Sequence, residues 1–432
     1  MVETLRADVA VVGGGPAGVA AACRAAEAGA GVVLIDEGLA PGGQIHRHLP
    51  GEEPPSGARR WLVRLSRTRA RLVPAAAVFD AERDGSTWLL RALKGESVLF
   101  VRASRLVLAT GAREIFLPFP GWTLPGVIGA GAAQALLRSG ARLAGKRAVV
   151  AGTGPLLLAA AAGLAKAGAV VAFVAEQASF GSLFRFAAGS VRTPGKLVEG
   201  AHYRLSIART PYRAGFWVKA AGGNGHVERA HVTDGRRKLE VPCDLLCVGY
   251  GLVPNLELAR LIGCLTDGLR VAAGGSQETS VRDVFAAGEL CGIAGVEAAV
   301  AEGEIAGLAA AGAFRPEEPP GRSLMESRAK ARRFGERMSG AFRLRHEVLG
   351  LATSETVVCR CEDVPLGRLA AARSMREAKL HTRSGMGPCQ GRVCGAALEA
   401  IRALGPDTVR VPVVPVPLAA LAALETTREE SP

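Results

Sequence analysis

Hydrophobic positions near the start of the chain form short continuous runs separated by a stretch with helical spacing. Val9–Val12 is an apolar run before a glycine-rich turn, Val19–Ala28 has the spacing of a helix, and Gly31–Ile35 is a second apolar run. Continuous apolar runs are typical of parallel strands that are buried on both faces. The pattern predicts a Rossmann-type unit of strand, turn, helix and strand.

The glycine-rich turn has the G-x-G-x-x-G spacing, with Gly13, Gly15 and Gly18 as its glycines and Pro16 and Ala17 between the last two. Gly13 permits a tight turn, Gly15 lets backbone amides approach a pyrophosphate, and Gly18 allows close packing of helix and strand. The start of the helix adds a partial positive charge. We therefore interpret this turn as a dinucleotide site, the alternative being a purely structural turn.

Two acidic residues follow the second predicted strand at the position that binds ribose in such units. Asp36 lies 23 residues after Gly13, and Glu37 comes next. Either carboxylate can bind ribose hydroxyls. Gly42, Gly43 and Gln44 form a further glycine-rich loop, which could lie along the same cofactor or be an ordinary turn.

Two later strand ends are candidates for further parts of the same nucleotide site. Short alternating runs over Arg71–Val101 predict a small antiparallel meander, and Leu106–Ala109 and Val284–Ala287 are apolar strands after it. The residues that follow these two strands are Thr110, Gly111, Gly288 and Glu289. A carboxylate at the last position can bind a ribityl hydroxyl. Plain strand ends are the alternative.

A second copy of the Rossmann pattern begins at Lys146–Ala151. Gly152 and Gly154 follow that strand, an Ala/Leu helix and a strand come next, and Glu176 ends the unit, but the third glycine position holds Leu157. NAD(P) or another adenine nucleotide is the expected ligand of Gly152, Gly154 and Glu176. The alternative is a structural lobe with an altered nucleotide pocket.

Four cysteines near the C-terminus form two close pairs, Cys359 with Cys361 and Cys389 with Cys394. A [2Fe-2S] cluster needs two sulfur ligands on each iron, which favours this cluster, although tetrahedral zinc or unligated thiols stay open. Cys243 and Cys247 share a face of a predicted strand, so we expect them in the core.

Composition and charge exclude several classes of protein. The chain has 432 residues with 49% hydrophobic and 22% charged, which is globular composition with room for several domains. The net charge of +13 is spread along the sequence and aromatic residues make up 5%, so we expect no nucleic-acid partner. We expect no targeting peptide, no transmembrane segment and a cytoplasmic location.

These patterns predict an α/β fold with two Rossmann-like dinucleotide-binding domains and a small helical C-terminal domain. We expect a linker after Phe314, because the composition of the chain changes there to Pro, Glu and Arg. The expected domains are a discontinuous first Rossmann-like domain (1–145 and 249–312), a second one (146–248), a linker and helix (313–350), a cysteine-bearing domain (351–405) and a C-terminal tail (406–432).

Several segments together resemble a known family. They are VVGGGPAG, PGGQI, LVLATGARE, AGTGPLLLAAA, VGYGLVPN, AAGE, VVCRCEDV and TRSGMGPCQGRVC. The chain resembles the FAD-containing subunits of heteromeric amine and amino-acid dehydrogenases, among them hydrogen cyanide synthase B, opine oxidase A and hydroxyproline dehydrogenase alpha subunits. Its C-terminal part is similar to the [2Fe-2S] domain of bacterioferritin-associated ferredoxin.

The resemblance implies roles for the residues named above. Gly13, Gly15, Gly18 and Asp36 or Glu37 would hold the ADP half of FAD, and the later loops would lie nearer the flavin. Cys359, Cys361, Cys389 and Cys394 would hold the cluster. The implied partners are a substrate-oxidising flavoprotein subunit and a small ferredoxin-like subunit.

Three functions follow from this combination. The first is an electron-transfer subunit that passes electrons from a partner to an acceptor, since flavin converts two-electron into one-electron chemistry. The second is a stand-alone NAD(P)H-dependent reductase. The third is a non-enzymatic iron-handling or scaffold protein. His46, just after the second glycine loop, is a candidate base, with a phosphate or surface contact as the alternative.

Overall fold

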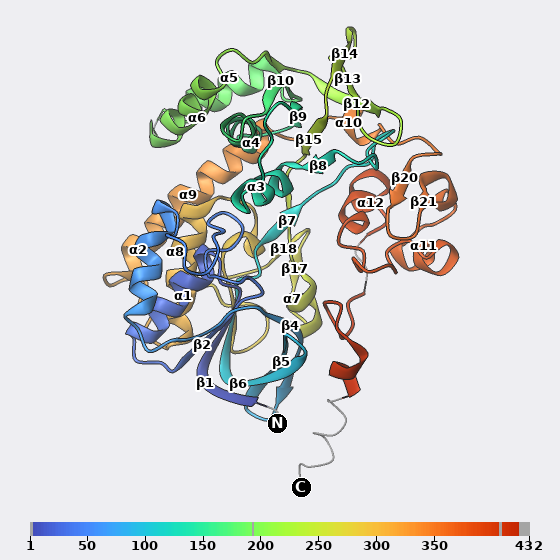
Figure 1. Ribbon diagram of the computed structural model, residues 1–432. Helices are drawn as coiled ribbons and strands as arrows, with labels where there is room; N and C mark the ends of the chain where they lie inside the picture. Colours follow the sequence, from blue (N-terminus) through green and yellow to red (C-terminus); the bar gives the residue numbers. More distant parts are fainter. Residues whose placement is uncertain (1–2, 192–193, 406–407, 423–432) are drawn as a thin grey trace. The chain divides into compact units, whose positions relative to one another are not determined.

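The computed structural model describes residues 3–191, 194–405 and 408–422 (Figure 1). The chain divides into a first unit (residues 1–113, 253–335 and 409–432) and a second unit (residues 114–252 and 336–408). Within the expected C-terminal tail 406–432, residues 406–407 and 423–432 lie outside the described residues, as do the first two residues of the chain. The domain boundaries expected from the sequence stay a prediction.

The first unit is built on a seven-stranded sheet in the order β3-β2-β1-β6-β5-β4, with β19 also paired to β6. Its strands are β1 (Glu3–Val12), β2 (Val32–Ile35), β3 (Arg71–Val73), β4 (Ala76–Asp84), β5 (Thr87–Lys94), β6 (Ser97–Leu108) and β19 (Val284–Ala286). Pairing is parallel around β1, and β4, β5 and β6 form the predicted antiparallel meander. Four-residue β2 is buried throughout, as its unbroken apolar run predicts.

One strand of this sheet has two roles. We predict the end of the meander and the strand at Leu106–Ala109 as separate strands, but β6 runs through both. It pairs antiparallel with β5 on one edge and parallel with β1 on the other. The meander is therefore part of the nucleotide-binding sheet, and its last strand ends where the cofactor is expected.

Two helices of the first unit approach closely because of small residues. The helices of this unit are α1 (Pro16–Glu27), α2 (Ser56–Ser66), α7 (Glu257–Ile262) and α8 (Val296–Ala310), with a 3-10 turn η1 (Gly288–Cys291) and a short hairpin of β17 (Thr266–Asp267) and β18 (Arg270–Val271). A Cβ added to Gly303 of α8 would lie 2.1 Å from the Ala17 carbonyl oxygen, and one on Gly307 would lie 2.2 Å from that of Ala21. Glycine at these positions lets α8 pack directly on α1.

The second unit contains a five-stranded parallel sheet in the order β11-β10-β9-β15-β8. Its strands are β8 (Val127–Gly129), β9 (Arg147–Gly152), β10 (Val170–Glu176), β11 (Tyr212–Ala214) and β15 (Leu245–Gly249). Helices α3 (Ala130–Arg138), α4 (Leu156–Lys166), α5 (Phe180–Gly189) and α6 (Pro194–Ser206) accompany it, together with an antiparallel sheet of β12 (Trp217–Gly222), β13 (Arg229–Thr233) and β14 (Lys238–Pro242). The predicted α/β class with two Rossmann-like units is confirmed.

The C-terminal cysteines belong to a small group of elements in the second unit. These elements are α10 (His346–Leu349), β20 (Val357–Cys359), β21 (Val364–Pro365), η2 (Leu366–Leu369), α11 (Met375–Thr382) and α12 (Cys394–Arg402). Val358, Val364, Leu369, Met375 and Leu398 form their apolar core.

The remaining segments connect the units. Strands β7 (Ala112–Glu114) and β16 (Leu252–Pro254) and the long helix α9 (Gly321–Ala341) span three of the crossings. After the cysteine-bearing elements the chain returns to the first unit, where the Val413 backbone N–H donates to the Phe79 carbonyl at 2.9 Å. Ala420 is buried beside Phe79 and Leu89.

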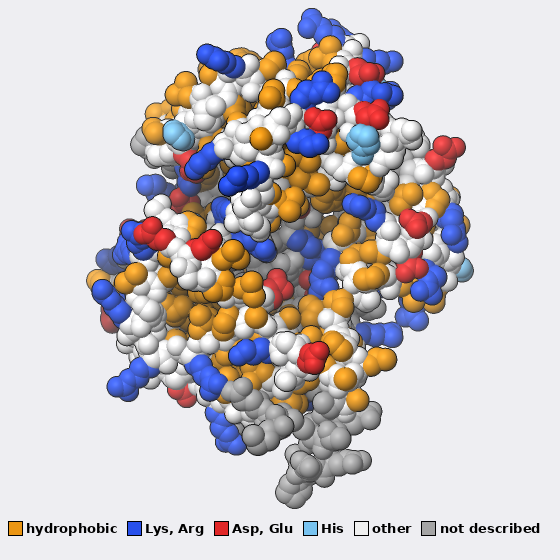
Figure 2. Space-filling view, viewed as in Figure 1, with side chains coloured by type: hydrophobic (Ala, Val, Ile, Leu, Met, Phe, Trp, Pro, Cys, Tyr) orange, Lys and Arg blue, Asp and Glu red, His pale blue; other side chains and the backbone are white. Residues whose placement is uncertain are grey.

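Surface charge agrees with the sequence. Figure 2 shows Lys and Arg side chains spread over the visible face with acidic side chains between them. Among the residues that the structure describes, no helix is both long enough and apolar enough to span a membrane.

Candidate functional site

The first glycine turn joins β1 to α1 in a conformation that larger residues cannot adopt. Gly13 has φ of +105°, and a Cβ there would lie 2.3 Å from the Ala109 carbonyl oxygen. A Cβ on Gly18 would lie 1.8 Å from the Gly13 carbonyl oxygen. At Gly15 a Cβ would meet nothing nearer than the Gly43 Cα at 3.9 Å. Two of the three glycines thus shape the turn, and the third faces open space.

Of the two candidate acids, Asp36 is buried under the turn and Glu37 is exposed. Burial raises the pKa of Asp36, although the backbone N–H groups of Gly14 and Gly38 donate to its carboxylate and lower it. Within the described residues, its Oδ2 atom has no hydrogen-bond partner. A buried acceptor without a donor is costly, so a hydroxyl-bearing ligand such as a ribose fits this position.

The second glycine loop lies against the first. The Gly42 backbone N–H donates to the Gly14 carbonyl at 2.7 Å, and a Cβ on Gly43, where φ is +62°, would lie 2.8 Å from the Gly15 Cα. Gln44 accepts a hydrogen bond from Arg47. The structure therefore brings Gly42 and Gly43 to the predicted dinucleotide turn.

The end of β6 is held by a residue that the sequence analysis does not single out. The Thr110 hydroxyl donates to the Asn255 carbonyl at 2.9 Å, and the Asn255 side-chain amide donates back to the Thr110 carbonyl at 2.8 Å. Arg113 donates to Asn255 Oδ1 at 2.7 Å. The only sequence feature that could have pointed to Asn255 is the run VPN shortly after Gly249 and Gly251. Its side chain fixes the backbone next to Gly111, where a Cβ would meet nothing within 4 Å.

The end of β19 is held by a buried ion pair. Gly288 has φ of +78° and packs on Ala17, and its backbone N–H donates to Glu302 Oε2 at 2.9 Å. Glu302 is 1% exposed and pairs with Arg332 at 2.5 Å. Burial raises the pKa of neighbouring Glu289, which the Arg332 charge opposes. A glutamate within the Gly/Ala-rich helix α8 was the signal for Glu302.

A cavity of about 360 Å³ lies beside the two glycine loops in the first unit. Its walls come from the loops and from α1, α2, α8 and α9, and include Pro16, Gly42, His46, Trp61, Val300 and Leu324. The His46 imidazole lies against Gly57, where a Cβ would be 2.8 Å from its Cε1 atom. His46 thus lines this cavity. Its role as a base stays a prediction.

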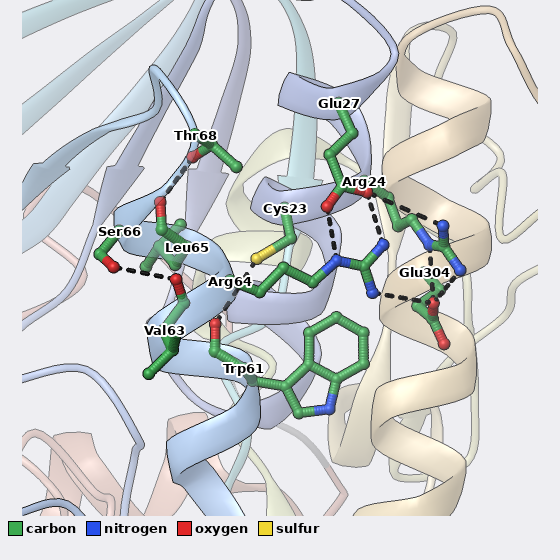
Figure 3. A network of polar contacts seen from close by, with 10 residues as sticks. All are labelled: Cys23, Arg24, Glu27, Trp61, Val63, Arg64, Leu65, Ser66, Thr68 and Glu304. Atoms are coloured by element: carbon green, nitrogen blue, oxygen red, sulfur yellow. Dashed lines mark hydrogen bonds and ion pairs between the residues drawn. The ribbon is translucent and has the colours of Figure 1, made fainter.

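A polar network ties α1, α2 and α8 together next to this cavity (Figure 3). Arg24 pairs with Glu304 at 2.5 Å and Arg64 with Glu27 at 2.5 Å. The Cys23 thiol donates to the Trp61 carbonyl at 3.8 Å, and burial raises its pKa to about 12. A thiol held in this protonated form is a structural group rather than a nucleophile.

The second glycine turn keeps the glycines that shape the backbone but differs from the first in detail. A Cβ on Gly152, where φ is +139°, would lie 1.8 Å from the Gly249 carbonyl oxygen. Leu157, at the third glycine position, is fully buried in the core of the sheet. Glu176 accepts from the backbone N–H groups of Gly154 and Ala178 at 2.8 Å. Burial raises its pKa to about 7.

The four C-terminal cysteines lie as two hydrogen-bonded pairs. The Cys394 thiol donates to Cys359 Sγ, which lowers the pKa of Cys359, and the Cys361 thiol donates to Cys389. These pairs join residues of different sequence motifs. Within the described part of the chain, no group of three or more His, Cys, Asp or Glu side chains is close enough together to hold a metal ion.

Backbone and glycine positions surround these thiols. The Gly385 backbone N–H donates to Cys359 Sγ at 3.5 Å. A Cβ on Gly387 would lie 2.3 Å from that of Cys361, so only glycine fits there. Cys243 and Cys247 are fully buried in the second unit, as predicted, and burial raises the pKa of Cys243 to about 11.

Comparisons with known proteins agree with this geometry. The A subunit of opine oxidase from Agrobacterium tumefaciens (strain Ach5) is 31% identical, over 97% of this chain and 92% of that protein. The hydrogen cyanide synthase subunit HcnB from Pseudomonas aeruginosa is 33% identical, over 96% of this chain and 98% of that protein. The predicted resemblance to these two kinds of subunit is confirmed.

A solved structure has the same fold. L-proline dehydrogenase from P. horikoshii superposes with a TM-score of 0.68 and 20% identity, covering 98% of this chain and 80% of that one. The pyridine nucleotide-disulphide oxidoreductase family matches residues 7–303, which include both glycine turns. The chain therefore belongs to the pyridine nucleotide-disulphide oxidoreductase family, and is an oxidoreductase.

Proposed function

We propose that the chain is the electron-transfer subunit of a heteromeric amine or amino-acid dehydrogenase, with FAD in its first unit and a [2Fe-2S] cluster at its C-terminal cysteines. The observation that carries this proposal is similarity over nearly the whole chain to two proteins that are themselves named as subunits. A fold alone would not suffice, because this fold hosts many reactions.

The residues of the first unit fit FAD. The open side of Gly15 and the start of α1 suit the pyrophosphate, and the unpartnered Oδ2 of Asp36 suits a ribose hydroxyl. Glu289 is the candidate acceptor for a ribityl hydroxyl, and Glu302 positions the backbone before it through the Gly288 N–H. When bound, the flavin supplies the exchange between two-electron and one-electron chemistry.

The four C-terminal cysteines offer the number and type of ligands that a two-iron cluster takes. Zinc takes four ligands around one centre, whereas a [2Fe-2S] cluster takes two on each of two irons. Cys359 with Cys394 and Cys361 with Cys389 are neighbouring thiol pairs, and together they would supply two ligands to each iron. The Gly385 N–H would donate to a cluster sulfur ligand at Cys359.

The cofactor assignment is tested by composition. Purified protein, reconstituted anaerobically with iron and sulfide, should contain flavin, iron and acid-labile sulfide, and Cys359→Ala should lose the iron and sulfide while it keeps the flavin. Cys264→Ala is the matched control, because Cys264 is buried to a similar extent in the first unit, away from the four predicted ligands. Full iron content in Cys359→Ala, or zinc in place of iron, would contradict the cluster.

The subunit role is tested by adding a partner. We expect the chain alone to show little amine or amino-acid oxidation with an artificial electron acceptor, and co-expression with a substrate-oxidising flavoprotein subunit to restore it. If the isolated chain oxidises such substrates as fast as the complex does, the subunit role is wrong. The flavin and iron contents are measured on the same samples, so loss of cofactor is distinguished from lack of a partner.

A further inference from the structure

The four residues between α9 and α10, Phe342 to Arg345, lie on the nucleotide-binding edge of the second unit. We call them the 342–345 segment. The Thr153 hydroxyl of the second glycine turn is 3.3 Å from the Phe342 carbonyl oxygen, within hydrogen-bonding distance. A Cβ on Gly154 would lie 4.0 Å from Phe342 Cγ. The segment therefore covers the residues that would face a pyrophosphate.

The side chain of Gln177 makes two hydrogen bonds with the backbone of this segment. This residue follows Glu176 at the end of β10 and is fully buried. Its side-chain amide donates to the Arg343 carbonyl at 3.0 Å and accepts from the Arg345 backbone N–H at 3.0 Å. The same amide group also donates to Thr153 Oγ1 at 2.9 Å. The amide N–H and the amide oxygen of Gln177 thus both bond to backbone groups of the segment, as backbone groups do between paired strands.

Aromatic contacts anchor the two ends of the segment. The Phe342 ring packs edge-on against Phe186, with 5.2 Å between ring centroids. The Arg345 guanidinium lies over the Trp217 ring at 4.7 Å, a distance at which the cation and the ring attract each other. These contacts restrain the segment from α5 on one side and β12 on the other.

The polar groups that a nucleotide needs are already engaged in this arrangement. A Rossmann site offers glycine-turn N–H groups to the pyrophosphate and an acid at the end of the second strand to the ribose. Here the Gly154 N–H donates to Glu176. In the first unit the corresponding acid, Asp36, accepts from Gly14, one position earlier in its turn. The two turns therefore differ at the group that would meet a phosphate.

We propose that the 342–345 segment is an internal ligand of the second unit, which occupies the place of a nucleotide's pyrophosphate and adjoining ribose, so that an adenine nucleotide binds there only when the segment leaves. A nucleotide and the segment then compete, and the affinity of the nucleotide is reduced by the small fraction of molecules in which the segment is released. NAD(P)H is accordingly a poor electron donor to this chain. This inference stands apart from the proposed function, because it concerns only residues of the second unit.

The test measures nucleotide binding and the state of the segment together, in the full chain. NADH and ATP are titrated by calorimetry, and hydrogen exchange of residues 342–345 is followed with and without each nucleotide. We expect no binding by the unaltered protein, or weak binding with faster exchange in the segment. Binding of either nucleotide with exchange in the segment unchanged or slowed would overturn the proposal.

Variants of the segment provide the second arm. The double variant Phe342→Ala with Arg345→Ala removes both aromatic contacts and leaves the glycine turn and Glu176 unchanged. Its affinity for nucleotide should be at least roughly tenfold higher than that of the unaltered chain. Arg343→Ala is the matched control, because Arg343 contributes its backbone carbonyl to the contact with Gln177. A folded double variant that binds nucleotide no better than Arg343→Ala would contradict the proposal. If the double variant fails to fold, Phe342→Ala and Arg345→Ala are measured singly, because each removes one aromatic anchor and keeps the other. No tighter binding of nucleotide by either single variant than by Arg343→Ala would then contradict the proposal.

Discussion

The indole N–H of Trp122 donates a hydrogen bond to the backbone carbonyl of Val357 at 2.6 Å, across 235 positions of sequence. Val357 begins strand β20, which ends at Cys359. The Arg360 guanidinium lies over the Trp122 ring at 5.5 Å, and Phe116 packs on the ring with 5.7 Å between centroids. One buried side chain thus holds the strand that carries the first predicted cluster ligand.

Replacing this side chain should weaken the attachment of β20. Trp122→Phe removes the donor and leaves the Val357 carbonyl without it, which costs about 1–3 kcal/mol in addition to the loss of packed volume. We expect a lower free energy of unfolding in urea, and faster hydrogen exchange at residues 357–361 than elsewhere in the second unit.

Trp88→Phe is the matched control for this change. Trp88 is 4% exposed and lies under Arg83 at 5.3 Å, but its Nε1 atom has no hydrogen-bond partner among the described residues. The two variants lose the same atoms, so their difference reports the hydrogen bond. Equal losses of unfolding free energy would show that the Trp122 bond to Val357 contributes nothing.

The first glycine turn is expected to tolerate no side chain at Gly18. In Gly18→Ala the added methyl would lie 1.8 Å from the Gly13 carbonyl oxygen, so the turn or α1 must move. We expect protein that is purified with less than a tenth of the flavin of the unaltered chain, measured by absorbance after denaturation, and a lower melting temperature.

A glycine in open space provides the comparison. Gly200 lies in helix α6, and a Cβ there would meet nothing within 4 Å. Gly200→Ala should keep the full flavin content and gain about 0.5–1 kcal/mol in unfolding free energy, since alanine favours helix over glycine. Normal flavin content in Gly18→Ala would show that close packing at this turn is dispensable.

The sequence predicted the parts of the site that depend on local spacing. Gly13, Gly18 and Asp36 belong to one unit of strand, turn, helix and strand, and their spacing in the sequence was enough to identify them. The meander, the parallel strands of both sheets and the burial of Cys243 also follow from short apolar patterns. These features are encoded over a few dozen residues.

Contacts between distant segments could not be predicted in this way. Nothing near Gln177 in the sequence shows that its amide binds residues 343 and 345, and the partner of Trp122 is a backbone carbonyl, which has no sequence signature. The pairing of Cys359 with Cys394 could not be predicted either, because the two residues belong to different motifs. Such contacts depend on how elements pack, which a single sequence does not state.

The ion pair below Gly288 should be essential to the first unit. Arg332→Gln leaves Glu302, which is 1% exposed, without its cationic partner, and breaking a buried pair on one side costs about 3–5 kcal/mol. Because Glu302 also holds the Gly288 N–H, we expect weaker flavin binding as well as a lower midpoint in urea.

An exposed ion pair serves as the control that separates the effect of burial from the effect of losing a charge. Arg282→Gln removes the same charge, but Arg282 is 92% exposed and its Nε lies 3.7 Å from Asp283. Surface pairs contribute about 0–1 kcal/mol, so this variant should unfold close to the unaltered protein. A loss for Arg332→Gln as small as that for Arg282→Gln would mean that Glu302 is stabilised in some other way.

Glu176 should make the stability of the second unit depend on pH. Burial raises its pKa from 4.5 to about 7, against the hydrogen bonds from Ala178, Gly154 and Thr153 that lower it. The folded protein therefore binds the proton more tightly than the unfolded chain does. The resulting stabilisation is fully present below pH 4.5 and is lost as the pH rises through about 7.

Replacing Glu176 by glutamine removes the titrating group, and so isolates its part of the pH dependence. Each pKa unit corresponds to about 1.4 kcal/mol, so Glu176 should account for a fall on the order of 3 kcal/mol in unfolding free energy over this pH range. Asp36, Glu114 and Glu289 also have pKa values raised by burial, so the unfolding free energy of the Glu176→Gln variant should still depend on pH to some extent.

The measurement is urea denaturation at a series of pH values. The unfolding free energy of Glu176→Gln should change less with pH than that of the unaltered chain, whatever its absolute stability. Glu336→Gln, at an exposed position of α9, controls for the change in net charge. Parallel profiles for the unaltered chain and Glu176→Gln would mean that this carboxylate keeps an ordinary pKa in the folded protein, and that water or a ligand reaches it.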